Sequence, residues 1–113
     1  MDNKQLNNTI TEIVTPSGEA VKMTLNFFLL YGVKTKFPET YKQYNKIMMG
    51  NMEDVFDAMT ILYTAYLCAL PEGEEPMPYE DFMQLFEDDI MFVMSEAMKL
   101  IGRKKKAGSA TRS

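Results

Sequence analysis

The segment from Asn51 to Leu70 constrains the fold of this chain more than any other part of the sequence. Its apolar side chains recur at steps of three and four residues, at Met52, Val55, Phe56, Met59, Leu62, Tyr63, Tyr66 and Leu70. This spacing predicts an amphipathic helix with one apolar stripe, capped by Asn51 and carrying Glu53 and Asp54 in its first turn. Residues 61–70 contain one clearly polar side chain, so we expect this half to be covered on more than one side, by other helices or by another subunit.

The N-terminal part of the chain has the pattern of a β-hairpin. Residues Ile10 to Val14 and Glu19 to Leu25 flank Thr15-Pro16-Ser17-Gly18, which places proline and glycine at the second and fourth positions of a turn. In the second arm, apolar side chains alternate with polar ones at Val21, Met23 and Leu25. Two strands alone are marginal in water, so the hairpin must lean on the helices or pair with something else. Residues 1–9 are polar, and we expect them to be disordered.

Two helices are expected between the hairpin and the central helix. Asn26 can cap a helix that begins with a dense apolar run at Phe27. Gly32 and the Phe37-Pro38 step are expected to interrupt it, because the residue before a proline avoids the α region. Pro38 then suits the first turn of a second helix, and Gly50 stops it. The apolar face of that second helix consists of Tyr41, Tyr44, Ile47 and Met48.

Two more helices are expected after the central one. Pro71 to Pro76 form an acidic loop rich in proline and glycine, and Pro78 opens the helix that follows it. Asp88-Asp89 can cap the last helix, whose apolar stripe includes Val93 and Met94. This helix either ends at Gly102 or is briefly prolonged by the basic run after it.

The length and composition fit one small folded domain. The chain has 113 residues, of which 46% are hydrophobic and 25% charged, too apolar a composition for an intrinsically disordered protein. The fold class is therefore mainly α, a small bundle of four to five helices with a short N-terminal β-hairpin. We assign residues 10–103 to a single helical domain and residues 104–113 to a basic flexible tail.

The residue types present exclude most familiar enzyme chemistry. Histidine and tryptophan are absent and Cys68 is the one cysteine, which removes Ser-His-Asp and Cys-His catalysis, His-containing zinc sites and any internal disulfide. The acidic stretch from Glu80 to Asp89 has apolar residues where a calcium-binding EF-hand loop needs its ligands and its central glycine. The glycines are scattered, so no phosphate-binding loop is formed. We expect no catalytic residue, no metal, no cofactor and no enzymatic activity.

The expected location is the cytoplasm. The sequence has no run of eighteen or more apolar residues, and its N-terminus is polar, so neither a membrane span nor a secretion signal is expected. Cys68 lies inside a hydrophobic run and fits a reduced compartment, where it packs as a small apolar side chain.

Charge is polarised along the C-terminal third of the chain. The stretch from Pro71 to Asp89 contains no base and eight acids, Glu72, Glu74, Glu75, Glu80, Asp81, Glu87, Asp88 and Asp89. The stretch from Lys99 to Ser113 contains no acid and six bases, Lys99, Arg103, Lys104, Lys105, Lys106 and Arg112. Opposite charges of this kind favour self-association or partner docking. A solvated acidic loop followed by a basic end that stabilises a helix C-terminus explains the same pattern.

Four segments of this sequence, taken together, resemble one protein family. They are Met23 to Tyr31 (MTLNFFLLY), Tyr41 to Met48 (YKQYNKIM), Ile61 to Cys68 (ILYTAYLC) and Pro78 to Phe82 (PYEDF), followed by a lysine-rich end. In combination they resemble the tail assembly chaperones of long-tailed, siphovirus-type bacteriophages and prophages of Gram-positive bacteria.

The resemblance implies a non-catalytic scaffold. Members of that family bind the long helical tape measure protein before the tail exists and recruit tail tube subunits, which displace them, so they are absent from the mature virion. Many are made in two lengths by ribosomal frameshifting. Lys104-Lys105-Lys106 can be encoded by an adenine-rich slippery run, so a longer frameshifted form is a hypothesis for this chain too.

A chaperone for a long amphipathic helix needs a deformable apolar groove, and methionine is suited to that purpose. The sequence has 11 methionines, and Met48, Met49 and Met52 gather at an inter-helix junction. We therefore predict that these three residues form the partner-binding surface. We expect acidic residues at its rim, namely Glu72, Glu74, Glu75, Glu80 and Asp81. Expected partners are the tape measure protein, the tail tube protein and further copies of this chain.

The alternative function is a helical adaptor or regulatory module that contacts nucleic acid through its basic tail. Arg103 to Lys106 are a short run without interleaved aromatic residues in a protein of net charge −4, so nucleic acid is the less favoured partner. The salt dependence of binding discriminates the chaperone function from the nucleic-acid alternative. The affinity for phosphate groups falls steeply as ionic strength rises, whereas the affinity of an apolar groove for its partner changes little.

Overall fold

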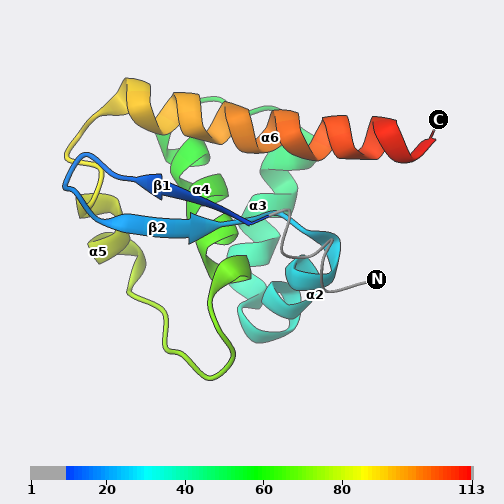
Figure 1. Ribbon diagram of the computed structural model, residues 1–113, viewed down its shortest axis with the longest axis horizontal. Coiled ribbons are helices and arrows are strands. Elements are labelled where there is room, and N and C mark those ends of the chain that lie inside the picture. Colours follow the sequence, from blue (N-terminus) through cyan, green and yellow to red (C-terminus); the bar gives the residue numbers. More distant parts are fainter. Residues whose placement is uncertain (1–9, 113) are drawn as a thin grey trace.

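The computed structural model describes residues 10–112, and the side chains of residues 10–102 (Figure 1). The elements in chain order are β1 (Thr11–Val14), β2 (Ala20–Met23), α2 (Phe27–Lys36), α3 (Pro38–Met49), α4 (Val55–Ala69), α5 (Tyr79–Gln84) and α6 (Ile90–Arg112). A mainly helical bundle with a two-stranded antiparallel hairpin at its N-terminal side confirms the predicted fold class. The disorder expected for residues 1–9 lies outside the described residues.

The hairpin forms where the alternating pattern and the turn residues place it. Its register pairs Thr11 with Met23 and Val14 with Ala20. The backbone N–H of Gly18 donates to the carbonyl of Thr15 over 2.8 Å, which closes the predicted turn. Gly18 has a φ of 95°, a left-handed conformation that glycine adopts without steric cost.

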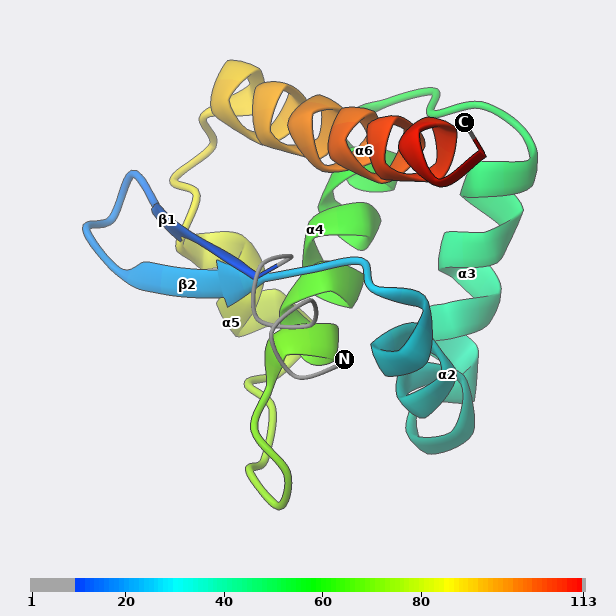
Figure 2. The same ribbon diagram turned by 45° about the vertical axis from the view of Figure 1, so that its right-hand side comes forward.

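The hairpin packs against the helices, as expected for a two-stranded sheet that is only marginally stable alone. Val21 and Met23 are buried on the inner face of β2, which packs against α4 (Figure 2). Just after β2, the Thr24 N–H donates to the Ala65 carbonyl of α4 over 3.1 Å. At the other end, the Ser17 N–H in the turn donates to the Leu85 carbonyl after α5 over 3.1 Å. The hairpin is therefore tied to the helices at both ends.

Helix α4 is the centre of the molecule. Ala58, Ile61, Leu62 and Ala65 are fully buried on one face of the helix, and Met59, Thr64 and Leu67 are buried on other sides of it. Elements β2, α2, α3, α5 and α6 all contact α4 (Figures 1 and 2). Coverage on several sides is thus confirmed, whereas the single apolar stripe was too narrow a description. Phe56, assigned to that stripe, is 62% exposed.

The start of α4 differs from the prediction by three residues. Asp54, and not Asn51, is the N-cap, and its Oδ1 accepts hydrogen bonds from the N–H groups of Phe56 (3.0 Å) and Asp57 (3.1 Å). A carboxylate adds favourable charge at the positive end of the helix dipole, which the neutral amide of Asn51 lacks. Met52 therefore precedes the helix instead of lying on it.

Helices α2 and α3 meet at the predicted proline step. Asn26 caps α2 by accepting a hydrogen bond from the Leu29 N–H over 3.2 Å. Gly32 does not interrupt α2, which continues to Lys36, because a single glycine costs a helix only about 1 kcal/mol and packing supplies more. Pro38 starts α3, and Gly50 follows its last residue, both as expected.

Two tyrosines of α4 hold the end of the acidic loop. The Tyr63 hydroxyl donates to the Met77 carbonyl over 2.8 Å, and the Tyr66 hydroxyl accepts from the Met77 N–H over 2.9 Å. The loop thereby positions α5, whose Phe82 is fully buried in contact with both tyrosine rings at centroid distances of 5.2 Å.

Helix α6 closes the bundle. Asp89 caps it as predicted, accepting a hydrogen bond from the Phe92 N–H over 3.0 Å. Its backbone passes Gly102 and remains helical to Arg112, so the helix is prolonged, but much further than the brief extension expected from the basic run. The side chains of the predicted basic tail, residues 104–113, lie outside those that the structure describes.

Candidate functional site

Helix α2 leaves its aromatic side chains in solvent. Phe27 is 78% exposed, Phe28 is 70% exposed and Tyr31 is 67% exposed, while Leu30 and Val33 face the core and are buried. We call Phe27, Phe28 and Tyr31 the aromatic ridge. Three neighbouring aromatic side chains in water are unusual, and exposed apolar patches of this kind mark interaction sites.

A groove runs between α2 and α3 beside the aromatic ridge. It has a volume of about 300 Å³. Its lining consists of Phe27, Leu30, Tyr31, Lys34, Tyr41, Tyr44, Asn45 and Met48. The Lys34 ammonium lies 5.7 Å from the centre of the Tyr41 ring, a distance suited to a cation–π interaction. We call this feature the α2–α3 groove; its lining is apolar and aromatic, and its one charged residue is a base.

The lining of the α2–α3 groove includes a buried tyrosine. Tyr44 is 4% exposed, and its hydroxyl has no hydrogen-bond partner among the described residues. Burial, with smaller contributions from Cys68 and Tyr41, raises the pKa of Tyr44 to about 12. A buried hydroxyl without a partner costs roughly 1–3 kcal/mol, so the Tyr44 hydroxyl is expected to lower the stability of the fold.

The three predicted methionines occupy different environments. Met48 is half-buried and lines the α2–α3 groove. Met49 is its neighbour at the end of α3 and is 81% exposed. Met52 is half-buried against the core in the connection to α4. Only Met48 is therefore placed to line a groove, and the aromatic ridge is the surface that sequence reasoning missed. The signal was present, since residues 27, 28 and 31 share a helix face that Leu30 and Val33 do not.

Three of the five predicted acids do not form a rim around those methionines. Glu72, Glu74 and Glu75 are exposed in the loop after α4, whereas Met52 lies before α4. Helix α4 has 15 residues, so the two groups are separated by about 22 Å of helix. Glu72 instead lies 3.7 Å from Lys36 in an exposed ion pair.

The other two predicted acids, Glu80 and Asp81, are exposed in the first turn of α5. None of the five lines the α2–α3 groove. The expected acidic rim is wrong for Glu72, Glu74 and Glu75, because the length of α4 was not part of the sequence pattern. For Glu80 and Asp81 it stays a prediction.

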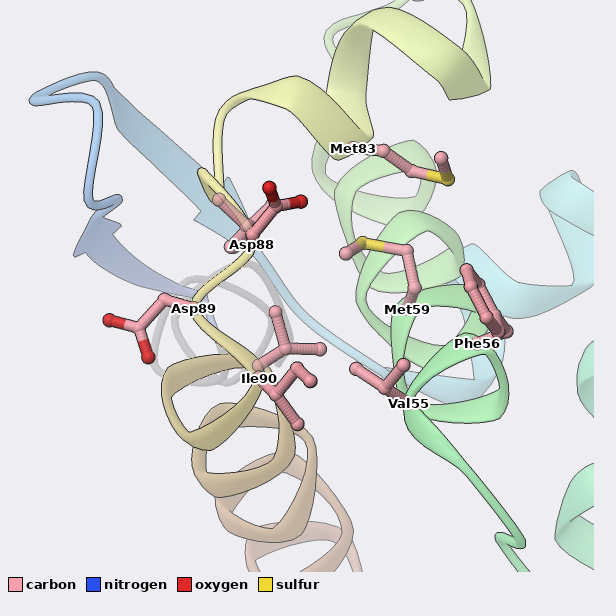
Figure 3. A pocket seen from close by; sticks show the side chains of 9 residues that line it. Val55, Phe56, Met59, Met83, Asp88, Asp89 and Ile90 are labelled. Carbon is pink, nitrogen blue, oxygen red and sulfur yellow. The ribbon is translucent and has the colours of Figure 1, made fainter.

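A second apolar hollow lies where α4, α5 and α6 meet (Figure 3). It has a volume of about 270 Å³. Its lining consists of Val55, Phe56, Met59, Met83, Phe86, Asp88, Asp89, Ile90 and Val93. Figure 3 shows Val55 and Ile90 facing one another across it, with Asp88 at its edge. We call it the α4–α6 hollow.

The acidic edge of the α4–α6 hollow has an unusual backbone. Glu87 and Asp88 have φ values of 48° and 61°, in the left-handed region that is costly for residues other than glycine and, to a lesser degree, asparagine and aspartate. Asp89 then caps α6. The sharp reversal of the chain brings the first residue of α6, Ile90, to the mouth of the hollow with 56% of its surface exposed.

Within the described residues, no three acidic or cysteine side chains gather closely enough to hold a metal ion. No helix in the same part of the chain is both long and apolar enough to cross a membrane. The groups that stand out are therefore apolar surfaces with charged edges, which suit contacts with other macromolecules.

Comparisons of the chain with protein families, with curated proteins and with solved structures found no match.

Proposed function

We propose that this protein is a non-catalytic tail assembly chaperone of a long-tailed bacteriophage. In this proposal it binds the tape measure protein in the host cytoplasm and helps to recruit tail tube subunits. The observation that carries the proposal is the aromatic ridge beside the α2–α3 groove. A surface built from Phe27, Phe28 and Tyr31 on a rigid helix supports a role in binding.

The size of the apolar surface favours a helical partner. Full burial of one phenylalanine side chain stabilises a contact by roughly 1.5–3 kcal/mol, and the ridge has three aromatic residues. An amphipathic helix lying in the α2–α3 groove would cover the ridge with residues spaced three and four apart. The adaptable Met48 side chain at the groove wall suits partners of varied sequence.

The charge beside the groove selects among such helices. Lys34 lines it, and Lys42 and Lys46 are exposed on α3. We therefore expect a partner helix that has acidic residues flanking its apolar stripe, the opposite of what an acidic rim would select. A long helical filament presents many such sites in series, and weak contacts repeated along it give high avidity.

The test is binding of a helical fragment of the tape measure protein from the same phage. Replacing Tyr31 with alanine removes one exposed ridge side chain without disturbing the core. We expect its affinity for the fragment to fall about tenfold or more, which corresponds to 1.4 kcal/mol. Isothermal titration calorimetry measures this loss, with Met98→Ser, an exposed residue of α6, as matched control. Equal affinity of Tyr31→Ala and the wild type would remove the α2–α3 groove from the proposal.

A further inference from the structure

Another cavity lies where α3, α4 and α5 meet, separate from both sites described above. It has a volume of about 320 Å³. In both views α4 lies between α3 and α5, so its residues form the middle of the lining (Figures 1 and 2). The lining combines two aromatic rings with polar side chains and consists of Glu39, Thr40, Gln43, Thr60, Tyr63 and Tyr79. We call this cavity the tyrosine pocket.

Two tyrosine rings give the tyrosine pocket an aromatic wall. The ring centres of Tyr63 and Tyr79 lie 5.2 Å apart and their planes are at 79°, an edge-to-face arrangement. Tyr63 is held in place by the hydrogen bond from its hydroxyl to the Met77 carbonyl and by its edge contact with the buried Phe82. The face of a tyrosine ring attracts cations electrostatically. The wall is therefore ordered and suited to a positively charged group.

The charged residue in the lining of the tyrosine pocket is an acid. Glu39 is exposed in the first turn of α3, where the helix dipole favours its ionised form. The lining contains no base among the residues that the structure describes. The ion pairs between described side chains are Lys36 with Glu72 and Lys99 with Glu96, so Glu39 has no cationic partner within that part of the chain.

Two further carboxylates lie near the Tyr79 hydroxyl. Burial raises the pKa of Tyr79, and the Thr60 hydroxyl beside it has the opposite effect. The negative charges of Asp54 and Asp57 raise this pKa further. Both carboxylates accept hydrogen bonds from backbone N–H groups, which have no net charge. The surroundings of the pocket are therefore negative, and a cation bound there would be stabilised by them.

The polar groups of the tyrosine pocket suit a ligand with several hydrogen-bond donors. The Glu39 carboxylate and the Gln43 amide oxygen are acceptors. The Thr60 hydroxyl already donates to the Phe56 carbonyl over 3.0 Å, so it acts towards a ligand as an acceptor. An arginine guanidinium has a permanent charge, a rigid fork of N–H donors and a flat face that stacks on aromatic rings. A lysine ammonium has fewer donors and no flat face.

We propose that the tyrosine pocket is a docking site for an arginine side chain of a partner protein. The guanidinium stacks on the Tyr79 ring, and its N–H groups donate to the Glu39 carboxylate and to the Gln43 amide oxygen. Arginine is one of the residues that dominate the binding energy of protein interfaces when a pocket receives it. Glu80 and Asp81 follow in the first turn of α5 and attract a basic partner surface to this region.

This inference does not rest on the proposed function. The α2–α3 groove includes Lys34, which repels a cation, so the groove and the tyrosine pocket select partners of opposite charge. The two sites share no lining residue, and one chain can therefore hold two different partners at once. Tyr31→Ala, which tests the groove, leaves the pocket intact. Loss of tape measure binding and loss of arginine binding are thus separate outcomes.

The experiment titrates the full chain with the capped tripeptide acetyl-Gly-Arg-Gly-amide and follows the backbone amide signals by NMR. The matched peptide has citrulline, an uncharged analogue of similar shape, in place of arginine. We expect saturable shifts centred on the amides of Gln43, Thr60 and Tyr79, and an affinity about fivefold or more higher for the arginine peptide. Equal affinities for the two peptides would overturn the proposal. A lysine peptide that binds as tightly as the arginine peptide would overturn it too.

Two charge variants locate the binding. Glu39→Gln removes the negative charge from the pocket with little change in size, and the affinity for the arginine peptide should fall about fourfold. Glu74→Gln makes the same change in the exposed acidic loop, outside the pocket, and should leave the affinity within about 1.5-fold of the wild type. Equal losses for the two variants would contradict the proposal, because they would describe a diffuse attraction to the acidic part of the chain.

A third variant tests the aromatic wall. Tyr79→Leu removes the ring, keeps an apolar side chain and should weaken arginine binding about threefold or more. If this variant loses its helical circular dichroism, Thr40→Trp takes its place, because a large side chain at that half-buried position of α3 fills the pocket. Thr40→Trp should abolish the saturable shifts. Unchanged affinity in either folded variant would show that the arginine binds elsewhere.

Discussion

Helices α4 and α2 are both rich in apolar residues, yet they have opposite roles in the fold. In α4, residues such as Ile61 and Leu62 are completely buried because five other elements surround the helix. In α2, only the inner face contacts α3 and α4, and the aromatic ridge remains in solvent. Apolar density alone therefore does not identify the core; the number of elements that cover a helix does.

The two helices also differ in what their exposed positions carry. Near the start of α4, the half-buried Asp57 accepts a hydrogen bond from the Glu53 N–H, and the one large exposed apolar side chain of this helix, Phe56, borders the α4–α6 hollow. The outward residues of α2 are aromatic first and basic afterwards. A helix needed only for stability would carry polar residues at those aromatic positions, so α2 combines a structural inner face with an outer face suited to binding.

The largest expected effect is a loss of stability on truncation within α4. Leu62→Ala should lower the free energy of unfolding by about 2–5 kcal/mol, because it opens a cavity at a fully buried position. Phe28→Ala on α2 is the matched test and should change it by no more than about 0.5 kcal/mol. Urea unfolding followed by circular dichroism measures both. Similar losses for the two variants would mean that the aromatic ridge is part of the core and would break the comparison.

A smaller effect is expected at the start of α4. Asp54→Ala removes the side chain that accepts hydrogen bonds from the Phe56 and Asp57 N–H groups, and it should cost about 1 kcal/mol of stability. Asn51→Ala is the control, because Asn51 makes no such bond in the structure and its replacement should change little. Thermal unfolding checks the pair. A larger loss for Asn51→Ala would restore the cap position that the sequence pattern suggested.

The smallest change in stability at neutral pH is expected at Tyr44 of α3. Tyr44→Phe removes a buried hydroxyl that has no partner, so stability should stay level or rise by up to about 1 kcal/mol. The stability of the variant differs more clearly from that of the wild type at high pH. The folded protein holds the pKa of Tyr44 at about 12, against 10.0 for an exposed tyrosine, so the unfolded chain loses this proton first. The contribution of the protonated Tyr44 to the free energy of unfolding is therefore fully present below pH 10 and is lost as pH rises towards 12.

Unfolding of wild type and Tyr44→Phe at several pH values above 9 measures this difference. The variant should lose stability less steeply between pH 10 and pH 12. Part of the alkaline loss should remain, because burial also raises the pKa of Tyr63 and of Tyr79. Identical slopes for the two proteins would show that the Tyr44 hydroxyl is solvated and that the α2–α3 groove is more open than the structure indicates.

The known preferences of residues for turns, helix caps and helix starts were enough to predict the structure wherever neighbouring residues decide it. The Thr15-Pro16-Ser17-Gly18 turn, the Asn26 cap, the proline step at Pro38 and the Asp89 cap could all be predicted. Gly32 and Asn51 were misjudged because their outcome depends on competition, between a glycine and the packing of α2 in one case and between two possible caps in the other.

The candidate site could be predicted only in part. Met48 was placed at an interaction surface by its residue type, and it does line the α2–α3 groove. Glu72 was expected beside it and lies beyond the other end of α4, since pairing residues across a fold requires knowing helix lengths and directions. Helical spacing separates Phe27 and Phe28 from the face that carries Leu30, but only the packing of the whole chain shows which of the two faces is covered.

The order of charges along the chain is a property of the sequence alone, as are the helical periodicity, the turn and the absence of histidine. These features follow from residue identity and from the spacing of residues along the chain. The positions of the aromatic ridge and the α4–α6 hollow on opposite sides of the domain were decided only by the tertiary structure. Burial is shared among segments distant in sequence, so whether a given apolar side chain ends in the core or on the surface depends on how the whole chain packs.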